Sequence, residues 1–518
     1  MFDMRKLYFL LLLSTVATNA QSFLWLQSPD VNLALNPDLV GYCVAVDQSD
    51  NVYAAGFKDN AYPYNDIFGD VFFNKYDTAG QPLFSKTFTG RLNVYAMEAD
   101  NAGNVYMDIG YISNATIGTL VLSTVNQGIQ PLLVKFDADG NVLWHYTPSI
   151  GGSTETRFRT FTVDSSGQVY LGMDNFMNSY IVKMSADGVP LMTIAQTKTH
   201  LLNSIDTDID GNIYAAGSCA DPNSTFAGVT VSTDFSYNDW VVKYSPAGVY
   251  QWMQYVEDIT CSLPQVRATT PDNVYFTSDL YGSYAFGSLT AEGPAQGLFN
   301  DFFLAKLNAA GQFEWLKEVV GVGAVDHGGR TYLTTDSQDN VCFVGKTRGT
   351  VDWGNGVTTT AQGFVGDVIA LKFDSGGNLL MAKTAGGTAD DRIDSAVFNN
   401  SNEIVVSGMG RGSGTFDALT HEGTGSTPYA FVAKISGPLL DVDGHQLATI
   451  QISPNPVVGS LNILNLAQSQ KAIILDTLGQ DVFSGFCQPG QSLDVSALSK
   501  GVYLLKLENC KAVKFVKD

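Results

Sequence analysis

The sequence predicts an all-β protein: a seven-bladed β-propeller closed by an N-terminal strand, followed by a small C-terminal β-sandwich. Two hairpin phrases alternate and recur through most of the 518-residue chain, which is typical of repeat architectures. Glycine (51 residues) and aromatic side chains (11 %) are both abundant, which favours many short strands joined by tight turns.

The first phrase is a strand carrying a lysine, a turn ending in glycine, and a second strand. In its clearest copy, residues 301–315, Asn308 can cap the turn and Gly311 can adopt the positive φ that closes it. The lysine recurs at Lys75, Lys135, Lys183, Lys243, Lys306, Lys372 and Lys434. By subtraction, consecutive lysines are 60, 48, 60, 63, 66 and 62 residues apart, so the period survives insertions.

The second phrase is a turn followed by a β-rich strand. Its copies open at Asp47, Asp100, Asp164, Asp208 and Asp336, with weaker ones at Thr269 and Asn399. With the segment before each turn, every repeat has four strands: A and B joined by this turn, then C with the lysine, then D. The B-to-C connections are long, and they share one face with the D-to-A connections. Since long loops on a rigid scaffold commonly carry binding sites, we expect a ligand on this face.

The D strand is one copy short. D phrases occur at Phe84, Trp144, Met192, Trp252, Trp315 and Met381. That makes six, whereas A, B and C each occur seven times. The segment Phe23-Leu24-Trp25 has the sequence pattern of a D strand, but no C strand precedes it. We expect it to pair antiparallel with residues 429–435 and to close the ring, because closure removes an exposed sheet edge. Residues 21–437 are therefore predicted to form the propeller.

The two ends of the chain indicate export. Arg5 and Lys6, the apolar run 7–13 and the small residues ending at Ala20 predict a signal peptide over residues 1–20. No other stretch is apolar enough to predict a transmembrane segment. Residues 438–449 are a polar linker, and 450–518 alternate short strands with Gly and Pro turns. The formal net charge of −22 disfavours nucleic acid as a partner.

Two stretches resemble known families. The phrases at 208–217 and 301–315 resemble the bacterial β-propeller repeat of secreted and surface proteins, a family without a single activity. Residues 450–518 resemble the type IX secretion C-terminal sorting domain of Bacteroidota. The residues that carry this resemblance are Pro454, Asn455, Pro456, Gly479, Gly501, Tyr503, Lys514 and Lys517. It implies Sec export to the periplasm, handling by the type IX machinery, and release or anchoring at the cell surface.

Few side chains indicate chemistry. A lysine occurs once in each repeat, whereas a unique ligand site would not recur. We therefore predict a structural Lys–Asp pair in each blade rather than a ligand contact. The carboxylates of Asp206, Asp208 and Asp210 are oxygen-rich, as calcium requires, but the later acidic ligand is absent and a turn role explains most of the pattern. The pairs Asp326-His327 and His421-Glu422 and the run 390–392 could serve acid–base chemistry, although turn roles account for them too. We assign no catalytic, cofactor-binding or metal-binding residue.

The six cysteines are too few for a disulfide scaffold. Cys219 follows strand B of the fourth blade and Cys261 follows its strand D, so both should lie on the long-loop face and pair. Cys487 and Cys510 are a second candidate pair within the tail.

The function predicted is a secreted or cell-surface binding or adhesion module whose long-loop face takes a glycan or an extracellular protein. Two alternatives remain: a structural surface protein, and a surface hydrolase or lyase with its site on the same face. Non-repeated polar residues converging near the central axis would favour an enzyme, and a broad aromatic and polar loop face would favour a binding module.

Overall fold

The protein is described by a computed structural model that divides into two compact units, Met1–Gly437 and Pro438–Asp518. It describes residues 21–32, 40–60, 67–125, 128–153, 155–259, 262–293, 301–319, 323–354, 356–363, 365–437, 451–464, 470–476, 480–507 and 513–518. Every regular element in these ranges is a β-strand. No helix in them is long and apolar enough to cross a membrane.

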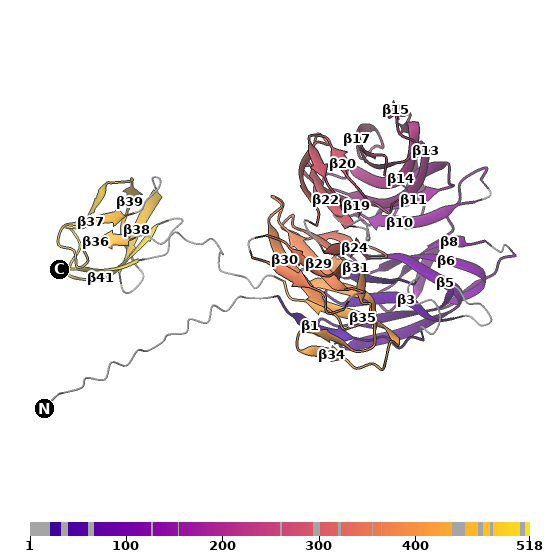
Figure 1. Cartoon of the computed structure of the whole chain (residues 1–518), viewed down its shortest axis with the longest axis horizontal. Helices are drawn as coiled ribbons and strands as arrows, with labels where there is room; N and C mark the ends of the chain where they lie inside the picture. Colours follow the sequence, from indigo (N-terminus) through magenta and orange to yellow (C-terminus); the bar gives the residue numbers. More distant parts are fainter. Residues whose placement is uncertain are drawn as a thin grey trace. The chain divides into compact units, whose positions relative to one another are not determined.

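The first unit is a β-propeller built from four-stranded antiparallel meanders (Figure 1). Each meander is a blade, named here by its innermost strand A. Blade β2 comprises β2 (Tyr42–Val46), β3 (Val52–Asn60), β4 (Gly69–Tyr76) and the first half of β5 (Pro82–Ala99). Blade β5 continues with the second half of β5, then β6 (Val105–Ile117), β8 (Gln130–Phe136) and β9 (Val142–Tyr146).

The next two blades repeat this plan, sharing one long strand between them. Blade β10 comprises β10 (Arg157–Val163), β11 (Val169–Asp174), β12 (Asn178–Met184) and the first half of β13 (Pro190–Thr207). Blade β13 comprises the second half of β13, β14 (Ile213–Phe226), β16 (Asn238–Tyr244) and β17 (Tyr250–Glu257).

The remaining blades stand as separate sheets. Blade β18 comprises β18 (Gln265–Thr270), β19 (Asn273–Leu280), β22 (Asp301–Leu307) and β23 (Phe313–Lys317). Blade β24 has a divided A strand, β24 (Ala324–His327) and β25 (Leu333–Thr335), followed by β26 (Val341–Arg348), β29 (Asp367–Phe373) and β30 (Leu379–Ala385). Blade β31 comprises β31 (Arg392–Phe398), β32 (Ile404–Arg411), β35 (Pro428–Ile435) and β1 (Phe23–Gln27).

Short extra strands decorate the B-to-C connections. They are β7 (Leu120–Leu122), β15 (Val229–Val231), β20 (Tyr284–Phe286), β21 (Leu289–Ala291), β27 (Thr350–Asp352), β28 (Thr358–Thr360), β33 (Gly414–Phe416) and β34 (Leu419–His421). They lie on the face where the A strands begin, since B-to-C and D-to-A connections emerge together. The elaborated face expected from the sequence therefore lies at one end of the propeller axis.

The repeated residues hold neighbouring blades together. The indole N–H of Trp144 donates to Ala186 O (3.2 Å), that of Trp252 to Ala309 O (2.9 Å) and that of Trp315 to Ser375 O (3.0 Å). Each acceptor lies in the C–D turn of the next blade, and a glycine in that turn packs against the indole. These glycines have positive φ and no Cβ, so the turn can approach the ring closely.

The lysines are structural, but their partners vary more than expected. Lys75, Lys135 and Lys372 form ion pairs with the turn aspartates Asp47 (3.7 Å), Asp100 (3.3 Å) and Asp336 (2.6 Å). Expecting aspartate in every blade was wrong: Lys306 pairs with Glu314 (2.9 Å) and Lys434 with Glu403 (2.7 Å). Lys183 and Lys243 lie over tyrosine rings instead. The repeated ammonium group therefore lies beside a carboxylate in five blades and over a tyrosine ring in the other two.

Strand β1 lies on the outer side of β35 (Figure 1). It pairs antiparallel, with Phe23 opposite Ile435, Trp25 opposite Lys434 and Gln27 opposite Val432. Trp25 is buried, and its indole N–H donates to Thr78 O (3.2 Å) in the C–D turn of blade β2. Trp25 thus makes the contact that Trp144, Trp252 and Trp315 make in other blades.

The second unit contains two small antiparallel sheets. One is formed by β36 (Gln451–Ser453), β37 (Ser460–Leu464) and β40 (Ser492–Asp494). The other has the order β39-β38-β41-β42, with β38 (Gln470–Leu475), β39 (Asp481–Cys487), β41 (Gly501–Leu507) and β42 (Val513–Lys517). Both contribute to one core that includes Leu461, Ile463, Ile474, Leu505 and Phe515.

Candidate functional site

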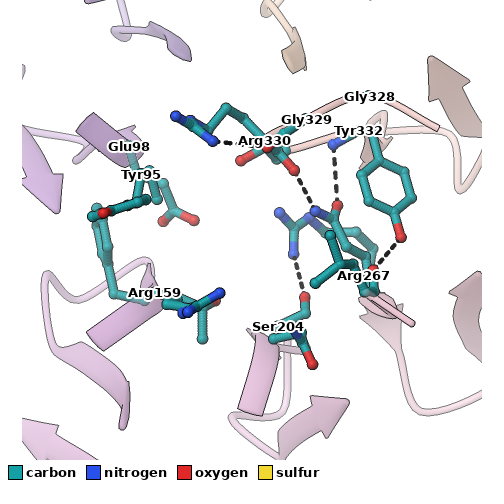
Figure 2. Close-up of a pocket in the computed structure, with 16 residues that line it drawn as sticks. Tyr95, Glu98, Arg159, Ser204, Arg267, Gly328, Gly329, Arg330 and Tyr332 are labelled. Atoms are coloured by element: carbon teal, nitrogen blue, oxygen red, sulfur yellow. Dashed lines mark hydrogen bonds between the residues drawn. The ribbon is translucent and has the colours of Figure 1, made fainter. Parts of the chain in front are cut away.

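A cavity of about 160 Å³ lies at the axis of the propeller, between the innermost strands of five blades (Figure 2). Its charged and larger polar side chains include Tyr95, Glu98, Arg159, Gln265, Arg267 and Arg330. They come from β5, β10, β18 and the segment between β24 and β25. Arg159 and Gln265 lie near the starts of their strands, at the end of the axis where the elaborated face lies.

Arg330 forms one wall of the cavity by crossing the axis. Its Nε donates to Val94 O (2.9 Å) and its Nη2 to Asn93 Oδ1 (3.1 Å), both in blade β5. Its guanidinium also lies 5.5 Å from the ring centroid of Tyr95, a cation–π contact. A Cβ added at Gly41 would lie 2.7 Å from its Cζ, so the guanidinium fills the space beside blade β2. Arg330 therefore separates the cavity from blade β2.

Arg267 and Arg159 have donors to spare. Arg267 Nη1 donates to Val266 O (2.9 Å) and to Ser204 Oγ (3.4 Å), and its other guanidinium N–H groups have no hydrogen bond to a residue that the structure describes. Arg159 is exposed, and the structure gives its guanidinium no hydrogen bond or ion pair with any residue that it describes. In Figure 2 both side chains point into the space between Glu98 and Ser204. Two cations with unused donors thus face one cavity.

Two acidic side chains near the axis, Glu98 and Asp206, bond to the A strand of the next blade. Glu98 Oε2 accepts the backbone N–H of Val163 (2.8 Å) in the next blade, and Asp206 Oδ2 accepts that of Ala268 (2.8 Å). Burial raises the pKa of Glu98 to about 7, although Arg267 opposes the shift. Burial also raises the pKa of Asp206. Near neutral pH, Glu98 is therefore only partly ionised.

The balance of these charges favours an anion. Three guanidinium groups line the cavity, and Glu98, the one carboxylate among its lining residues, is only partly ionised near pH 7. This positive convergence sits inside a chain with a net charge of −22. A guanidinium presents paired N–H donors that match the two oxygens of a carboxylate. The geometry thus suits a small carboxylate or a similar oxyanion on a larger ligand.

The acid–base candidates from the sequence do not converge there. Asp326 pairs with Arg348 Nη1 (2.5 Å), and Asp390 with Lys346 Nζ (3.1 Å). His421 Nδ1 lies 2.9 Å from Ser28 Oγ, and its ring stacks on Tyr429 at 3.7 Å. Asp391 accepts backbone N–H groups of Gly387 and Arg411. Each of these side chains has a local structural partner.

His327 also has a structural environment. Its Nε2 lies 3.1 Å from Asp279 Oδ1 and its Nδ1 lies 2.5 Å from Gly328 O. Burial lowers the pKa of His327, but the Asp279 carboxylate outweighs this effect and raises it to about 9. With acceptors at both ring nitrogens, the imidazole stays protonated at neutral pH and cannot accept a proton.

The acidic turn at 206–210 does not form a cluster. Asp208 accepts the backbone N–H groups of Asp210 (3.0 Å) and Asn212 (2.9 Å) and the hydroxyl of Tyr214 (2.8 Å). Asp206 instead accepts the backbone N–H of Ala268 (2.8 Å) in the next blade. In the described part of the chain, no group of three His, Cys, Asp or Glu side chains could hold a metal ion.

One cysteine prediction was wrong. Cys487 is a free, buried thiol, so it does not pair with Cys510; its side chain belongs to the apolar core of the second unit. Cys219 is disulfide-bonded, whereas its expected partner Cys261 lies outside the described residues.

The residues of the sorting motif mostly support the fold of the second unit. Asn455 donates to Lys514 O (3.2 Å) and accepts from the Val516 N–H (2.9 Å), which ties the segment to β42. Tyr503 donates to Ser499 O (2.9 Å) and stacks on Phe515. Lys517 is buried. Pro454 and Pro456 are exposed, Gly501 opens β41, and Gly479 lies outside the described residues.

The repeat carries a signal for the axial residues that the sequence reasoning missed. Counting two positions back from the openers Asp100, Asp164, Asp208 and Thr269 gives Glu98, Thr162, Asp206 and Arg267. Counting five back from Asp100 and Asp164 gives Tyr95 and Arg159. At Tyr95 and Arg159 the register between strands A and B shifts by one residue, which is a β-bulge. A β-bulge changes the direction in which a side chain points. Variable residues at fixed positions of strand A therefore mark the axis.

Comparison with known proteins identifies the tail. Residues 451–517 match the secretion system C-terminal sorting domain. The tail therefore marks the chain for export by type IX secretion. No curated protein is recognisably similar in sequence.

Solved structures resemble the first unit only distantly. The Dos1 propeller shares 9 % identity over 80 % of this chain and 95 % of its own, with a TM-score of 0.38. A calcium-binding regucalcin from Agrobacterium tumefaciens shares 9 % identity over 81 % and 95 %, with a TM-score of 0.32. A protein of unknown function from Bacteroides caccae shares 13 % over 60 % and 89 %, also at 0.32. Likenesses this distant say nothing about ligand or activity.

Proposed function

We propose that this chain is an exported binding protein whose propeller takes a carboxylate-bearing ligand in the axial cavity. The observation that carries the proposal is the convergence of Arg159, Arg267 and Arg330 on one cavity in a strongly acidic protein. Sites of this kind combine a concave surface with a few polar groups that fix orientation. Tyr95 and Gln265 supply such groups beside the arginines.

The proposed organisation follows the repeat. Residues 1–20 are a signal peptide, 21–437 a seven-bladed propeller, 438–449 a linker and 450–518 a sorting domain folded as a β-sandwich. Strand β1 closes the ring as the fourth strand of blade β31, supported by its pairing with β35 and by Trp25 docking on blade β2. The chain passes through the periplasm and is then released or held at the cell surface by the type IX machinery.

A disulfide between Cys219 and Cys261 belongs to the same proposal. Cys43, Cys342 and Cys487 are free thiols, which leaves few partners for Cys219. The bridge would tie the end of blade β13 to its strand β14, since Cys219 lies within that strand and not after it as the sequence led us to expect.

The ligand test uses the mature exported protein and isothermal titration. Glucuronate is the probe and glucose is its uncharged match. A uronic acid oligosaccharide and an aspartate-rich peptide then distinguish a glycan from a protein ligand. We expect glucuronate to bind and glucose not to bind, because the guanidinium groups recognise the carboxylate.

Charge-neutral variants locate the site. Arg159→Gln should weaken glucuronate binding about tenfold or more, the loss expected for one charge-assisted hydrogen bond. Arg159 is exposed, so this change should leave the fold intact. Lys500→Gln removes the same charge in the tail and should change nothing. Equal affinity in the parent protein and Arg159→Gln would contradict the proposed site.

A hydrolase or lyase at the same cavity is the second candidate, favoured by Glu98. A carboxyl group with a pKa of about 7 can act as a general acid near neutral pH. Cleavage of the uronic acid oligosaccharide by the parent protein and its loss in Glu98→Gln would select this function. Binding without any cleavage would reject it.

A further inference from the structure

The two outer faces of the second unit differ in character. On the outer face of β36, β37 and β40, the exposed side chains of the two latter strands are Ser460, Asn462, Leu464, Ser492 and Asp494. Ser492 Oγ donates to Asn462 Oδ1 (2.6 Å) across the strands. A solvated sheet face is normally polar in this way.

The outer face of the other sheet is apolar. Its exposed side chains include Val482, Phe486, Val502 and Leu504, and Phe486 is 72 % exposed. Ile473, Leu475 and Val516 lie half-buried between them. Val502 stands opposite Val516, and Leu475 opposite Leu504, so these side chains are contiguous. These seven residues are named the apolar face.

Lysines accompany this face. Lys506 stands opposite Ile473, Lys471 opposite Phe486 and Lys514 opposite Leu504. All three lysines are exposed. Among the residues of these four strands whose side chains the structure describes, none on this face is acidic. Positive charge from β38, β41 and β42 therefore flanks the apolar face.

We propose that the export machinery holds this chain by the apolar face, through a partner surface that is apolar at its centre and acidic at its rim. The unit matches the secretion system C-terminal sorting domain over residues 451–517, so a partner that handles it must contact its surface. A contiguous exposed apolar patch marks such a contact, and the lysines select an acidic partner. The polar outer face of β37 and β40 offers neither feature.

A second copy of the chain fits this face poorly. A two-fold interface brings the same patch of both copies together. Such an interface would cover Lys471, Lys506 and Lys514 of both copies, and the described side chains of the four strands on this face offer them no acidic partner. Like charges at an interface oppose association, so self-association through this face is disfavoured.

The test measures export of the full chain in the bacterium that makes it. Phe486→Glu and Leu504→Glu place a charge on the apolar face, and Lys506→Glu reverses the charge at its rim. Leu464→Glu makes the same kind of change on the opposite outer face, where Leu464 is 43 % exposed. The readouts are the immunoblot ratio of exported to cell-retained protein, and the thermal unfolding and sedimentation of each purified chain.

We expect the three face variants to lower the exported fraction about tenfold or more, as for loss of an interface hot spot, and Leu464→Glu to export normally. Phe486→Glu or Leu504→Glu could impair folding. Lys506 is exposed, so Lys506→Glu should fold normally and still tests the contact. Normal export of all three face variants would overturn the proposal. Normal export with an altered sedimentation coefficient would also overturn it, assigning the face to self-association. Normal export with altered propeller unfolding would assign it to the chain's own propeller.

Discussion

Replacing Trp25 with alanine should destabilise the whole propeller. Its side chain is 8 % exposed and packs in the groove between β35 and the C–D turn of blade β2. A Cβ added at Gly80 would lie 2.7 Å from its Cδ2, so the ring fills that space closely. Since β1 is the outer strand of blade β31, losing this contact loosens the junction between the two ends of the propeller.

The expected cost can be divided between packing and hydrogen bonding. Removing a buried tryptophan side chain costs about 3–5 kcal/mol of unfolding free energy. Trp25→Phe keeps most of the packing but loses the N–H bond to Thr78 O, worth about 1 kcal/mol. That carbonyl also accepts Lys434 Nζ (2.9 Å), so it keeps a partner and the phenylalanine variant should be mild. Leu24→Ala is the matched control, because Leu24 is exposed on the same strand.

Guanidinium unfolding of the mature protein, followed by circular dichroism, ranks the three variants. Hydrogen exchange then locates the effect: Trp25→Ala should speed exchange in β35 and in β2 as well as in β1. The reasoning fails if Trp25→Ala is no more destabilising than Leu24→Ala, or if faster exchange stays within β1.

Three further predictions follow from the same structure. Glucuronate affinity should rise as the pH falls through 7, because protonation of Glu98 removes a negative charge from the cavity; Glu98→Gln should flatten this dependence in titrations, and an unchanged pH profile would contradict it. Non-reducing peptide mapping should recover Cys219 bridged to Cys261, closing a loop worth about 3–4 kcal/mol, and recovery of Cys261 as a free thiol would refute the bridge. A chain ending at Gly437 should fold yet accumulate in the periplasm, and its N-terminus should be Gln21 by mass spectrometry; equal export with and without the tail would contradict the sorting role.

Much of the fold could be predicted from the sequence because the same turn and packing residues recur in successive blades. The turn aspartates accept backbone N–H groups two and four residues ahead, as Asp47 does from Ser49 and Asn51, and such turns leave a clear pattern. The tryptophans of D strands pack against turn glycines of the next blade. This pattern identified the segment around Trp25 as the seventh D strand. The tail was recognisable because its motif residues, such as Asn455 and Tyr503, hold strands together.

The axial cavity was not predicted, because it is lined by side chains that differ from blade to blade. Arg159, Arg267 and Arg330 occupy different positions of their A strands, and Arg330 lies where the strand of blade β24 is interrupted. Their meeting depends on the arrangement of the blades around one axis, which brings together residues far apart in the sequence. The histidines stand out more in the sequence, but His327 and His421 have structural partners in Asp279 and Ser28.

The most direct test of the central claim is a crystal structure of the mature protein with glucuronate bound. We predict ligand density in the axial cavity, with the carboxylate within hydrogen-bonding distance of Arg159 and Arg267. Density elsewhere on the elaborated face, or an empty cavity at saturating glucuronate, would contradict the account.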